Sequence, residues 1–97
     1  MTANKSNGHD AGINQLLTFP CRVHIKALGK HTTRFQALVH SIVSRHITAD
    51  DLLASSTRLS RGGKYLAVTL TISAGSRAQL DNIYRDLTGC KEVLIAL

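Results

Sequence analysis

The stretch of sequence that decides the fold runs Arg58-Leu59-Ser60-Arg61-Gly62-Gly63-Lys64-Tyr65-Leu66-Ala67-Val68-Thr69-Leu70-Thr71-Ile72. Two alternating runs of apolar and polar residues flank its Gly-Gly pair, and glycines readily adopt the positive φ angles of a two-residue hairpin turn. The stretch therefore predicts an antiparallel β-hairpin. Counting outward from the turn gives the register of one face: Leu59 with Leu66, Thr57 with Val68, Ser55 with Leu70 and Leu53 with Ile72. That face is mainly apolar and is expected to meet the core, whereas the opposite face is polar and rich in hydroxyls.

The residues before the hairpin change their hydrophobic period once. Residues 19–29 alternate between apolar and polar or basic side chains, which predicts a first strand. Thr33 followed by Gln36 has the form of a capping box, in which side chains satisfy free N–H groups at a helix start. Apolar residues then recur at helical spacing as far as His46, so a helix is expected between the first strand and the hairpin.

After the hairpin the helical period returns. The strands of the hairpin are expected at about 52–61 and 64–74. Ser76 with Gln79 then forms a second capping signature, and Gly89 is expected to end this second helix. Residues 91–97 are predicted to form a last strand.

The order of the predicted elements is therefore β-α-β-β-α-β. Right-handed crossovers fold this order into a ferredoxin-like α+β sandwich, in which a four-stranded antiparallel sheet carries both helices on one face. The first and third strands are central, and the fourth strand pairs with the first. Residues 16–97 are expected to form this single domain, and residues 1–15, which are rich in Asn, Ser, Gly and Thr, a disordered tail.

The strand registers leave one face of the sheet uncovered by helices. The candidate interaction residues on this open face are Arg22, His24, Lys26, Arg58, Tyr65 and Thr69. The last strand is expected to add Leu94 and Ala96 beside Leu28, with Val93, Ile95 and Leu97 pointing inward. Such an apolar strip at a sheet edge favours a dimer through the fourth strand, because unprotected edges invite pairing with another chain. A helix-mediated contact, or a monomer kept apart by its charge, is the alternative.

The charge of the chain points to an anionic partner. The net charge of +6 lies wholly within residues 16–97, because Lys5 and Asp10 cancel in the segment before them. No acid occurs between Asp10 and Asp50, and a second group of basic residues surrounds the hairpin turn. Such a balance favours acidic proteins, small anionic ligands or nucleic acid. No run of about 18 apolar residues exists to span a membrane, and no secretory signal is visible, so a cytoplasmic location is expected.

The residues that could carry chemistry do not assemble into a catalytic or metal site. Cys21 and Cys90 begin neighbouring antiparallel strands, which places them at opposite ends, too far apart for a disulfide or a shared metal. His24 has no carboxylate near it in the sequence to complete an acid–base pair. His46, in the last turn of the first helix, is interpreted as a cap for free carbonyl groups. We therefore expect no enzyme activity, no metal and no cofactor.

Two other classes of protein share the predicted topology. Acylphosphatases cradle phosphate in a Gly-rich loop after the first strand, but residues 29–33 contain one glycine, which gives little support to an anion-cradling loop. RNA-recognition modules stack bases on aromatic residues of the two central strands. Here only Tyr65, near the turn, could stack a base, so nucleic acid is not the expected partner.

Several short segments within residues 16–97 are similar to segments of a known protein family. They are Leu17-Thr18-Phe19-Pro20, Lys26-Ala27-Leu28-Gly29, Val43-Ser44-Arg45-His46, Ser60-Arg61-Gly62-Gly63-Lys64-Tyr65 and Gln79-Leu80-Asp81-Asn82-Ile83-Tyr84. In order and spacing the chain resembles the YbeD family, small bacterial proteins of unknown function. The resemblance implies a ferredoxin-like fold related in shape to the ACT regulatory domain, and it brings no catalytic residues. It favours a non-enzymatic regulatory or protein-interaction domain of ACT-like type, which binds a protein or a small anionic ligand through the open face. A weak RNA-binding module is the alternative.

Overall fold

The computed structural model describes residues 17–97, so the tail expected over residues 1–15 lies outside the described residues. The elements in chain order are β1 (Cys21–Lys30), α2 (Phe35–Ser44), the short 3-10 helix η1 (Ala49–Asp51), β2 (Leu52–Leu59), β3 (Tyr65–Ala74), α3 (Arg77–Thr88) and β4 (Ile95–Ala96). The predicted order of strands and helices is therefore confirmed.

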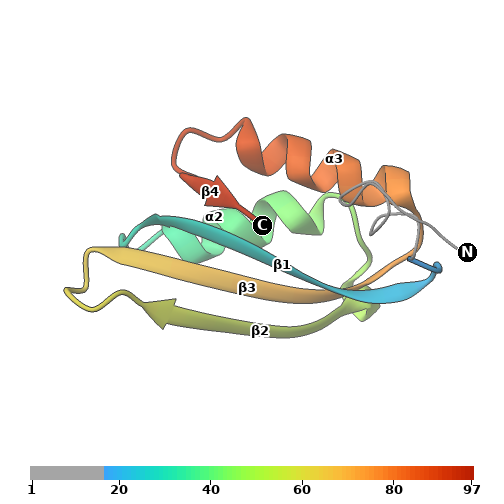
Figure 1. Cartoon of the computed structure of the whole chain (residues 1–97), viewed down its shortest axis with the longest axis horizontal. Coiled ribbons are helices and arrows are strands. Elements are labelled where there is room, and N and C mark those ends of the chain that lie inside the picture. The colour runs from blue at the N-terminus through green and yellow to red at the C-terminus, as the bar shows by residue number, and fades with distance from the viewer. Residues whose placement is uncertain (1–16) are drawn as a thin grey trace, which may run out of the picture.

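The four strands form one antiparallel sheet in the order β2-β3-β1-β4. Both helices pack on the same side of this sheet (Figure 1). The central places of β1 and β3, and the pairing of β4 with β1, are those of the predicted ferredoxin-like α+β fold. The open face of the sheet is the one that turns away from the two helices.

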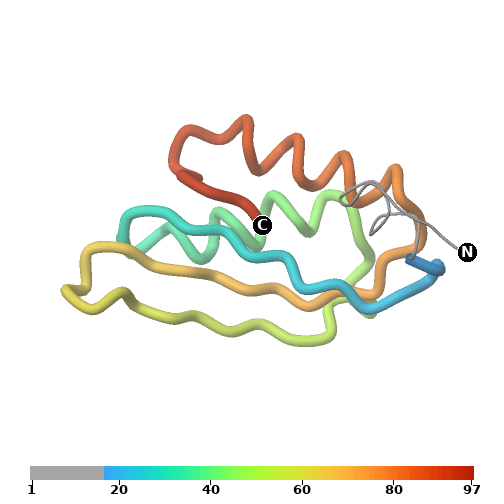
Figure 2. Tube along the Cα trace, in the orientation of Figure 1, coloured from blue at the N-terminus to red at the C-terminus, as the bar shows by residue number. Residues whose placement is uncertain are grey.

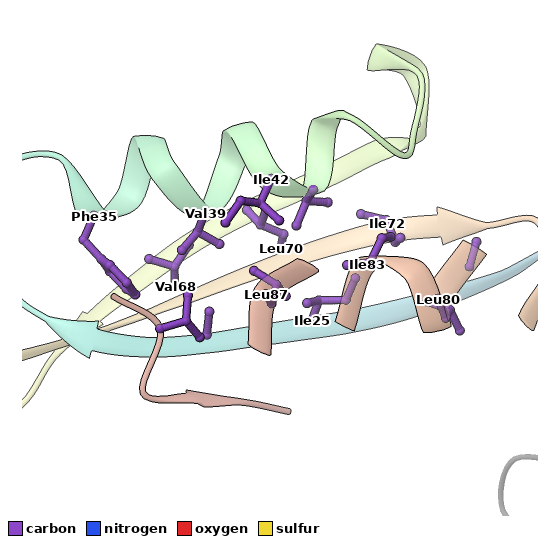
Figure 3. Packing of buried hydrophobic residues seen from close by; sticks show 14 of the residues in the cluster. Ile25, Phe35, Val39, Ile42, Val68, Leu70, Ile72, Leu80, Ile83 and Leu87 are labelled. Carbon is purple, nitrogen blue, oxygen red and sulfur yellow. The ribbon is translucent and has the colours of Figure 1, made fainter. Parts of the chain in front are cut away.

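The hydrophobic core fills the space between the helices and the two central strands (Figure 3). Its fully or almost fully buried members come from β1, α2, β3 and α3: Ile25, Ala27, Phe35, Val39, Ile42, Val43, Val68, Leu70, Ile72, Ala74, Ile83 and Leu87. Burying a large aliphatic or aromatic side chain is worth about 1.5–3 kcal/mol, so this cluster is the main source of stability. It also holds β1 and β3 flat against the helices, which fixes the side chains on their opposite face.

The register of the hairpin is confirmed over most of its length. Leu59 faces Leu66 and Ser55 faces Leu70, but a bulge between Leu52 and Ala54 sets Leu52 against Ile72, so the predicted partner of Ile72 is wrong. An extra residue in one strand produces such a slip, and alternation alone does not reveal where it occurs.

The turn differs from the predicted two-residue form. Ser60 N–H donates to the carbonyl of Tyr65 at 2.9 Å, which closes a longer loop over residues 61–64. Within that loop Gly63 N–H donates to the carbonyl of Ser60 at 2.8 Å, and Gly63 alone of the glycine pair has a positive φ, 78°. The register is unchanged because the longer loop takes one residue from each side of the Gly-Gly pair, Arg61 and Lys64. In the tube view the end of the hairpin stands clear of the helices (Figure 2).

Strand β2 is an exposed edge rather than a wall of the core. The expected core-facing residues Leu53 and Leu59 are 46% and 48% exposed, whereas their neighbours on β3 are buried. The helices cover β1 and β3 and stop short of β2. Among residues 17–97, the only hydrogen bond between side chains of α2 and β2 joins His40 Nε2 to Ser55 Oγ, at 2.9 Å.

The two helices begin differently. Ser76 Oγ accepts a hydrogen bond from Gln79 N–H at 3.1 Å, and Gln79 Oε1 accepts from Gly75 N–H at 2.7 Å, so the second capping signature is confirmed. The first one is wrong: α2 starts at Phe35, its N-cap is Arg34, and no side chain caps it. Thr33 lies instead in a turn that Phe35 N–H closes on the carbonyl of Thr32 at 3.4 Å.

The predicted last strand is wrong in length. Its facing is confirmed at Val93, which is buried, but is wrong after Val93. Only Ile95 and Ala96 are regular strand, and Ala96 faces the buried Ala27, so Ala96 packs on the core side. Ile95, 50% exposed, faces Leu28 on the open side. Leu94 N–H donates to the carbonyl of Leu28 at 2.8 Å, and Ile95 is the register partner of the same residue. Two consecutive residues thus lie opposite Leu28, as in a β-bulge, and this interrupts the alternation of side chains.

Candidate interaction surface

Three of the predicted residues lie in a row on β1. Arg22, His24 and Lys26 occupy alternate positions of the strand and are exposed, while Ile25 between them is buried beneath the helices. Side chains alternate between the faces of a strand, so burying Ile25 places its neighbours on the open face. The structure thus brings these three groups together as the sequence predicts.

Across the sheet the row on β1 meets hydroxyls and a further cation. Lys26 faces Thr69 of β3, and Thr69 in turn faces Ser56 of β2. In the next row Leu28 and Arg58 both face Ala67 from opposite sides. We define the cationic face as Arg22, His24, Lys26, Arg58 and Thr69.

The imidazole of His24 has a partner that the sequence analysis missed. His24 Nδ1 lies 2.8 Å from Oγ1 of Thr71, and the two residues are a register pair of β1 and β3. Thr71 is 8% exposed and is the one buried polar residue among those described. The hydrogen bond satisfies a hydroxyl that would otherwise be buried alone and fixes the ring on the open face. The pair follows from the register between β1 and β3, and the sequence alone does not give that register.

Tyr65 lies apart from the other candidates, at the hairpin end of β3. It faces Lys30, four register pairs beyond Lys26 and Thr69, and Lys64 Nζ lies 5.7 Å from the centre of its ring. That spacing is a cation–π contact. The structure therefore places Tyr65 beside the cationic face rather than within it.

Charges are divided between the two sides of the molecule. The strands and the hairpin loop carry Arg22, Lys26, Lys30, Arg58, Arg61 and Lys64, and no carboxylate. The rest of residues 17–97 carries as many acids as bases: Asp50, Asp51, Asp81, Asp86 and Glu92 against Arg34, Arg45, Arg77, Arg85 and Lys91. Among the described residues the ion pairs between Arg and carboxylate groups all lie on this second side: Arg34–Glu92, Arg45–Asp86 and Arg77–Asp81. The whole net charge therefore belongs to the sheet and its hairpin.

The open face is slightly hollowed next to the hairpin. Leu28 and Ala67 form the floor of a shallow depression of about 410 Å³, and Arg58 and Arg61 stand at its rim. This depression continues the cationic face toward the turn. Its floor offers apolar contact, and its rim offers two guanidinium groups for bidentate contact with carboxylates.

His46 does not cap α2, so that prediction is wrong. The helix ends at Ser44 with Arg45 as its C-cap, and His46 Nε2 instead lies 2.7 Å from Asp86 Oδ2 on α3. Arg45 Nη1 is 3.8 Å from the same carboxylate oxygen. Asp86 was missed because nothing in the sequence brings residues 40 positions apart together.

The thiols are free and far from each other along the sheet. Cys21 faces Ala74 at one end of β1, whereas Cys90 closes a turn with Val93 that leads to the Leu28 end. No cluster of three or more His, Cys, Asp or Glu side chains suited to a metal occurs in residues 17–97. Within the same residues no helix is long and apolar enough to cross a membrane.

Comparison with known sequences gives one consistent result. The sequence profile described as "Protein of unknown function (DUF493)" matches residues 14–97. A UPF0250 protein of Paraburkholderia phytofirmans is 40% identical over 82 residues, covering 84% of this chain and 92% of that one. A UPF0250 protein of Chromobacterium violaceum is 40% identical over 85 residues, covering 86% and 93%. The protein UPF0250 NE1487 of Nitrosomonas europaea is 42% identical over 72 residues, covering 74% and 83%.

Among solved structures, the solution structure of protein HP0495 from H. pylori is similar in fold. The TM-score is 0.64, and the match covers 94% of this chain and 98% of the other. The two sequences are 9% identical, so the likeness supports the shared α+β architecture and carries no residue roles.

Proposed function

Because the chain belongs to the DUF493 family, the YbeD family of small bacterial proteins of unknown function, we propose its function from the geometry of the sheet. It is a non-enzymatic interaction domain of ACT-like regulatory type that binds an acidic protein surface through the cationic face. The location we propose for it is the cytoplasm.

One observation carries this proposal: the entire net charge of +6 lies on the sheet and hairpin, which hold no acid among the described residues. A surface of one sign raises the local concentration of oppositely charged partners and speeds their encounter. The helical side carries as many acids as bases among the described residues, so it has no net charge to attract an acidic protein surface over its whole area. The cations of the sheet have no carboxylate of the described chain to satisfy them, so they remain available to a partner.

The chemistry of the open face favours binding over catalysis. The only imidazole in its row, His24, is bonded to the hydroxyl of Thr71 rather than to a carboxylate. General acid–base catalysis by His needs a proton acceptor or donor poised in the same site. Thr69, Ser56 and Thr71 instead supply short hydroxyls beside the cations, which suit hydrogen bonding to an acidic surface.

An apolar strip completes the surface. Leu28, Ile95 and Leu97 adjoin the cationic face; Ile95 is 50% and Leu97 67% exposed, and Leu97 exchanges both backbone hydrogen bonds with Lys26. A partner that covers the strip gains apolar burial, while its acids meet Lys26 and Arg58. A second copy of the chain fits less well, because two faces without acids repel each other.

The proposal is tested by affinity capture with two matched variants, each followed by quantitative mass spectrometry. Lys26→Glu with Arg58→Glu reverses two charges of the cationic face, and Arg77→Glu with Arg85→Glu reverses two charges of α3. We expect acidic proteins that the wild type captures to be lost from the first variant and retained by the second. Equal capture by both variants, with matching thermal stability, would remove the cationic face from the proposal.

A nucleic-acid partner is the competing hypothesis, and a separate binding experiment tests it. If the face binds RNA, affinity for a labelled single strand falls steeply with salt, and Tyr65→Ala weakens it by the loss of a stacked base, about 1–3 kcal/mol. We expect weak binding with no response to Tyr65, because that ring lies beyond the cationic row. A Tyr65-dependent complex at physiological salt would replace the proposed protein partner with RNA.

A further inference from the structure

A second hollow lies on the other side of the molecule, where three segments meet. Its volume is about 330 Å³. Lys30 from the end of β1, Thr32 and Arg34 from the following loop, Phe35 and Leu38 from α2, and Lys91, Glu92 and Leu94 from the segment before β4 line it. Volumes from about 300 to 1,000 Å³ are typical of pockets that hold small molecules.

The inner wall of this hollow is apolar. The ring of Phe35, which is 2% exposed, forms its base, with Leu38 half-buried beside it and Leu94 53% exposed at the mouth. Leu94 stands here because the slip in the last strand turns it to the helix side. An apolar wall with an exposed leucine at its mouth gains free energy when an apolar body covers it.

The rim of the hollow is cationic. Lys30, Arg34 and Lys91 surround it, and Arg34 Nη2 lies 3.3 Å from Glu92 Oε2, so the one acid of the lining is already paired. Lys30 and Lys91 keep their charge for another group, since no salt bridge within residues 17–97 includes either. The N-terminus of α2 lies beside them without a capping side chain or an acid in its first turn, which adds positive potential from the helix dipole.

The position of the walls is fixed by close packing at Gly29. A Cβ at this residue would lie 2.5 Å from Cζ of Phe35 and 2.5 Å from the backbone oxygen of Glu92. The end of β1 therefore touches both the ring at the base and the backbone of the opposite wall. The hollow is held open between packed elements rather than formed by a mobile loop, and such preorganisation lowers the cost of binding.

We propose that this hollow binds a small organic acid: a compact apolar body against Phe35, Leu38 and Leu94, and a carboxylate held between Lys30 and Lys91. This site is separate from the cationic face, so the proposal stands whether or not the open sheet binds a protein. It also differs from a backbone phosphate cradle, because side chains from three segments, and not a glycine-rich loop, supply its contacts.

The test uses the ¹⁵N-labelled full chain, titrated with 3-phenylpropionate while backbone amide resonances are followed by NMR. Two control ligands separate the contributions: 3-phenylpropionamide keeps the apolar body without the charge, and acetate keeps the charge without the body. We expect saturable shifts at residues of the lining, with the acid binding at least tenfold more tightly than either control. Equal affinity for acid and amide, or shifts centred on other residues, would overturn the proposal.

Matched variants assign the effect to the two lysines. Lys30→Gln with Lys91→Gln removes both charges with little change in shape, and Arg61→Gln with Lys64→Gln removes two charges from the hairpin loop, outside the hollow. The first pair should weaken 3-phenylpropionate at least tenfold and the second less than twofold. Leu94→Ala should weaken it severalfold through the lost apolar wall. Equal responses to the two lysine-containing pairs would show only a general charge effect and would count against the site.

Discussion

His46 Nε2 lies 2.7 Å from Asp86 Oδ2, and this contact ties the segment that follows α2 to the last turn of α3. A second bond reinforces it, because Gln79 Nε2 donates to the backbone carbonyl of His46 at 2.7 Å. Both residues of α3 thus hold the chain where it leaves α2. Since the carboxylate can only accept, the imidazole is the donor in the first bond.

We predict that this tie contributes measurably to stability. Asp86→Ala and His46→Ala should each lower the free energy of unfolding by about 1–2 kcal/mol, because each leaves a half-buried polar partner unsatisfied. The double variant should lose less than the sum of the single losses, by about 1 kcal/mol. Urea unfolding gives the free energy of unfolding of the wild type, the two single variants and the double variant. Asp81→Ala, which breaks the exposed contact with Arg77, is the control and should cost less than about 0.5 kcal/mol.

Tyr84 should give the chain an alkaline dependence of stability. Burial raises the pKa of its phenol above the usual 10.0, and its hydroxyl donates to the carbonyl of Leu97 at 2.8 Å. In the unfolded chain the phenol ionises first, so its contribution is fully present below pH 10.0 and is lost as pH rises through the folded-state pKa.

The Tyr84→Phe variant isolates this effect. At neutral pH it should be less stable than the wild type by about 0.5–1.5 kcal/mol, the worth of the lost hydrogen bond. Above pH 10 the stability of the wild type should fall more steeply than that of the variant, because only the wild type carries the perturbed phenol. Parallel stability curves across this range, from denaturant unfolding at each pH, would contradict the assignment.

Gly29 should tolerate no side chain. A Cβ there collides with the ring of Phe35 and the backbone of Glu92, so Gly29→Ala must displace packed elements and should cost about 1–3 kcal/mol or more. Gly62→Ala is the matched control, because nothing lies within 4 Å of its Cβ position. That change should be neutral or slightly stabilising. Thermal unfolding compares the two, and a stable Gly29→Ala protein would show that the base of the hollow is not rigid.

Weak self-association should appear only when charge is screened. At tens of micromolar we expect a monomer at low salt and a growing dimer fraction toward about 1 M salt, where the mutual repulsion of two cationic faces is suppressed. Ile95→Lys, on the open face, should abolish this dimer, and Leu94→Lys, on the helix side, should leave it intact. Sedimentation velocity distinguishes these cases. A dimer that dissociates with salt, or one that survives Ile95→Lys, would place the interface elsewhere.

The order of elements, the two central strands and most of the hairpin register could be predicted from the sequence. Alternation with period two and recurrence at helical spacing are local signals that depend on which face of an element is buried. The row Arg22, His24 and Lys26 followed from them, because burying Ile25 leaves no other face for these side chains. The same holds for Thr69 and Arg58, which the hairpin count placed on the open face.

How far the helices extend over the sheet, and where the alternation of a strand is interrupted, became visible only in the folded chain. Leu53 and Leu59 fit the apolar pattern but lie on an edge strand that neither helix covers. Val93 points inward as expected, but beyond it the inward and outward residues of the last strand are exchanged, because Leu94 and Ile95 are both set against Leu28. A bulge leaves no mark on composition, yet it turns every following side chain to the other face.

The ion pairs of the helical side and the hydrogen bonds of His24 and His46 also could not be predicted from the sequence. The net charge can be counted from the sequence, but the ion pairs Arg34–Glu92, Arg45–Asp86 and Arg77–Asp81 are seen only in the folded chain. His24 with Thr71, and His46 with Asp86, join residues 47 and 40 positions apart. Local propensity acts over a few residues, whereas such pairs form only once packing has brought distant elements together, and that is why the structure was needed to find them.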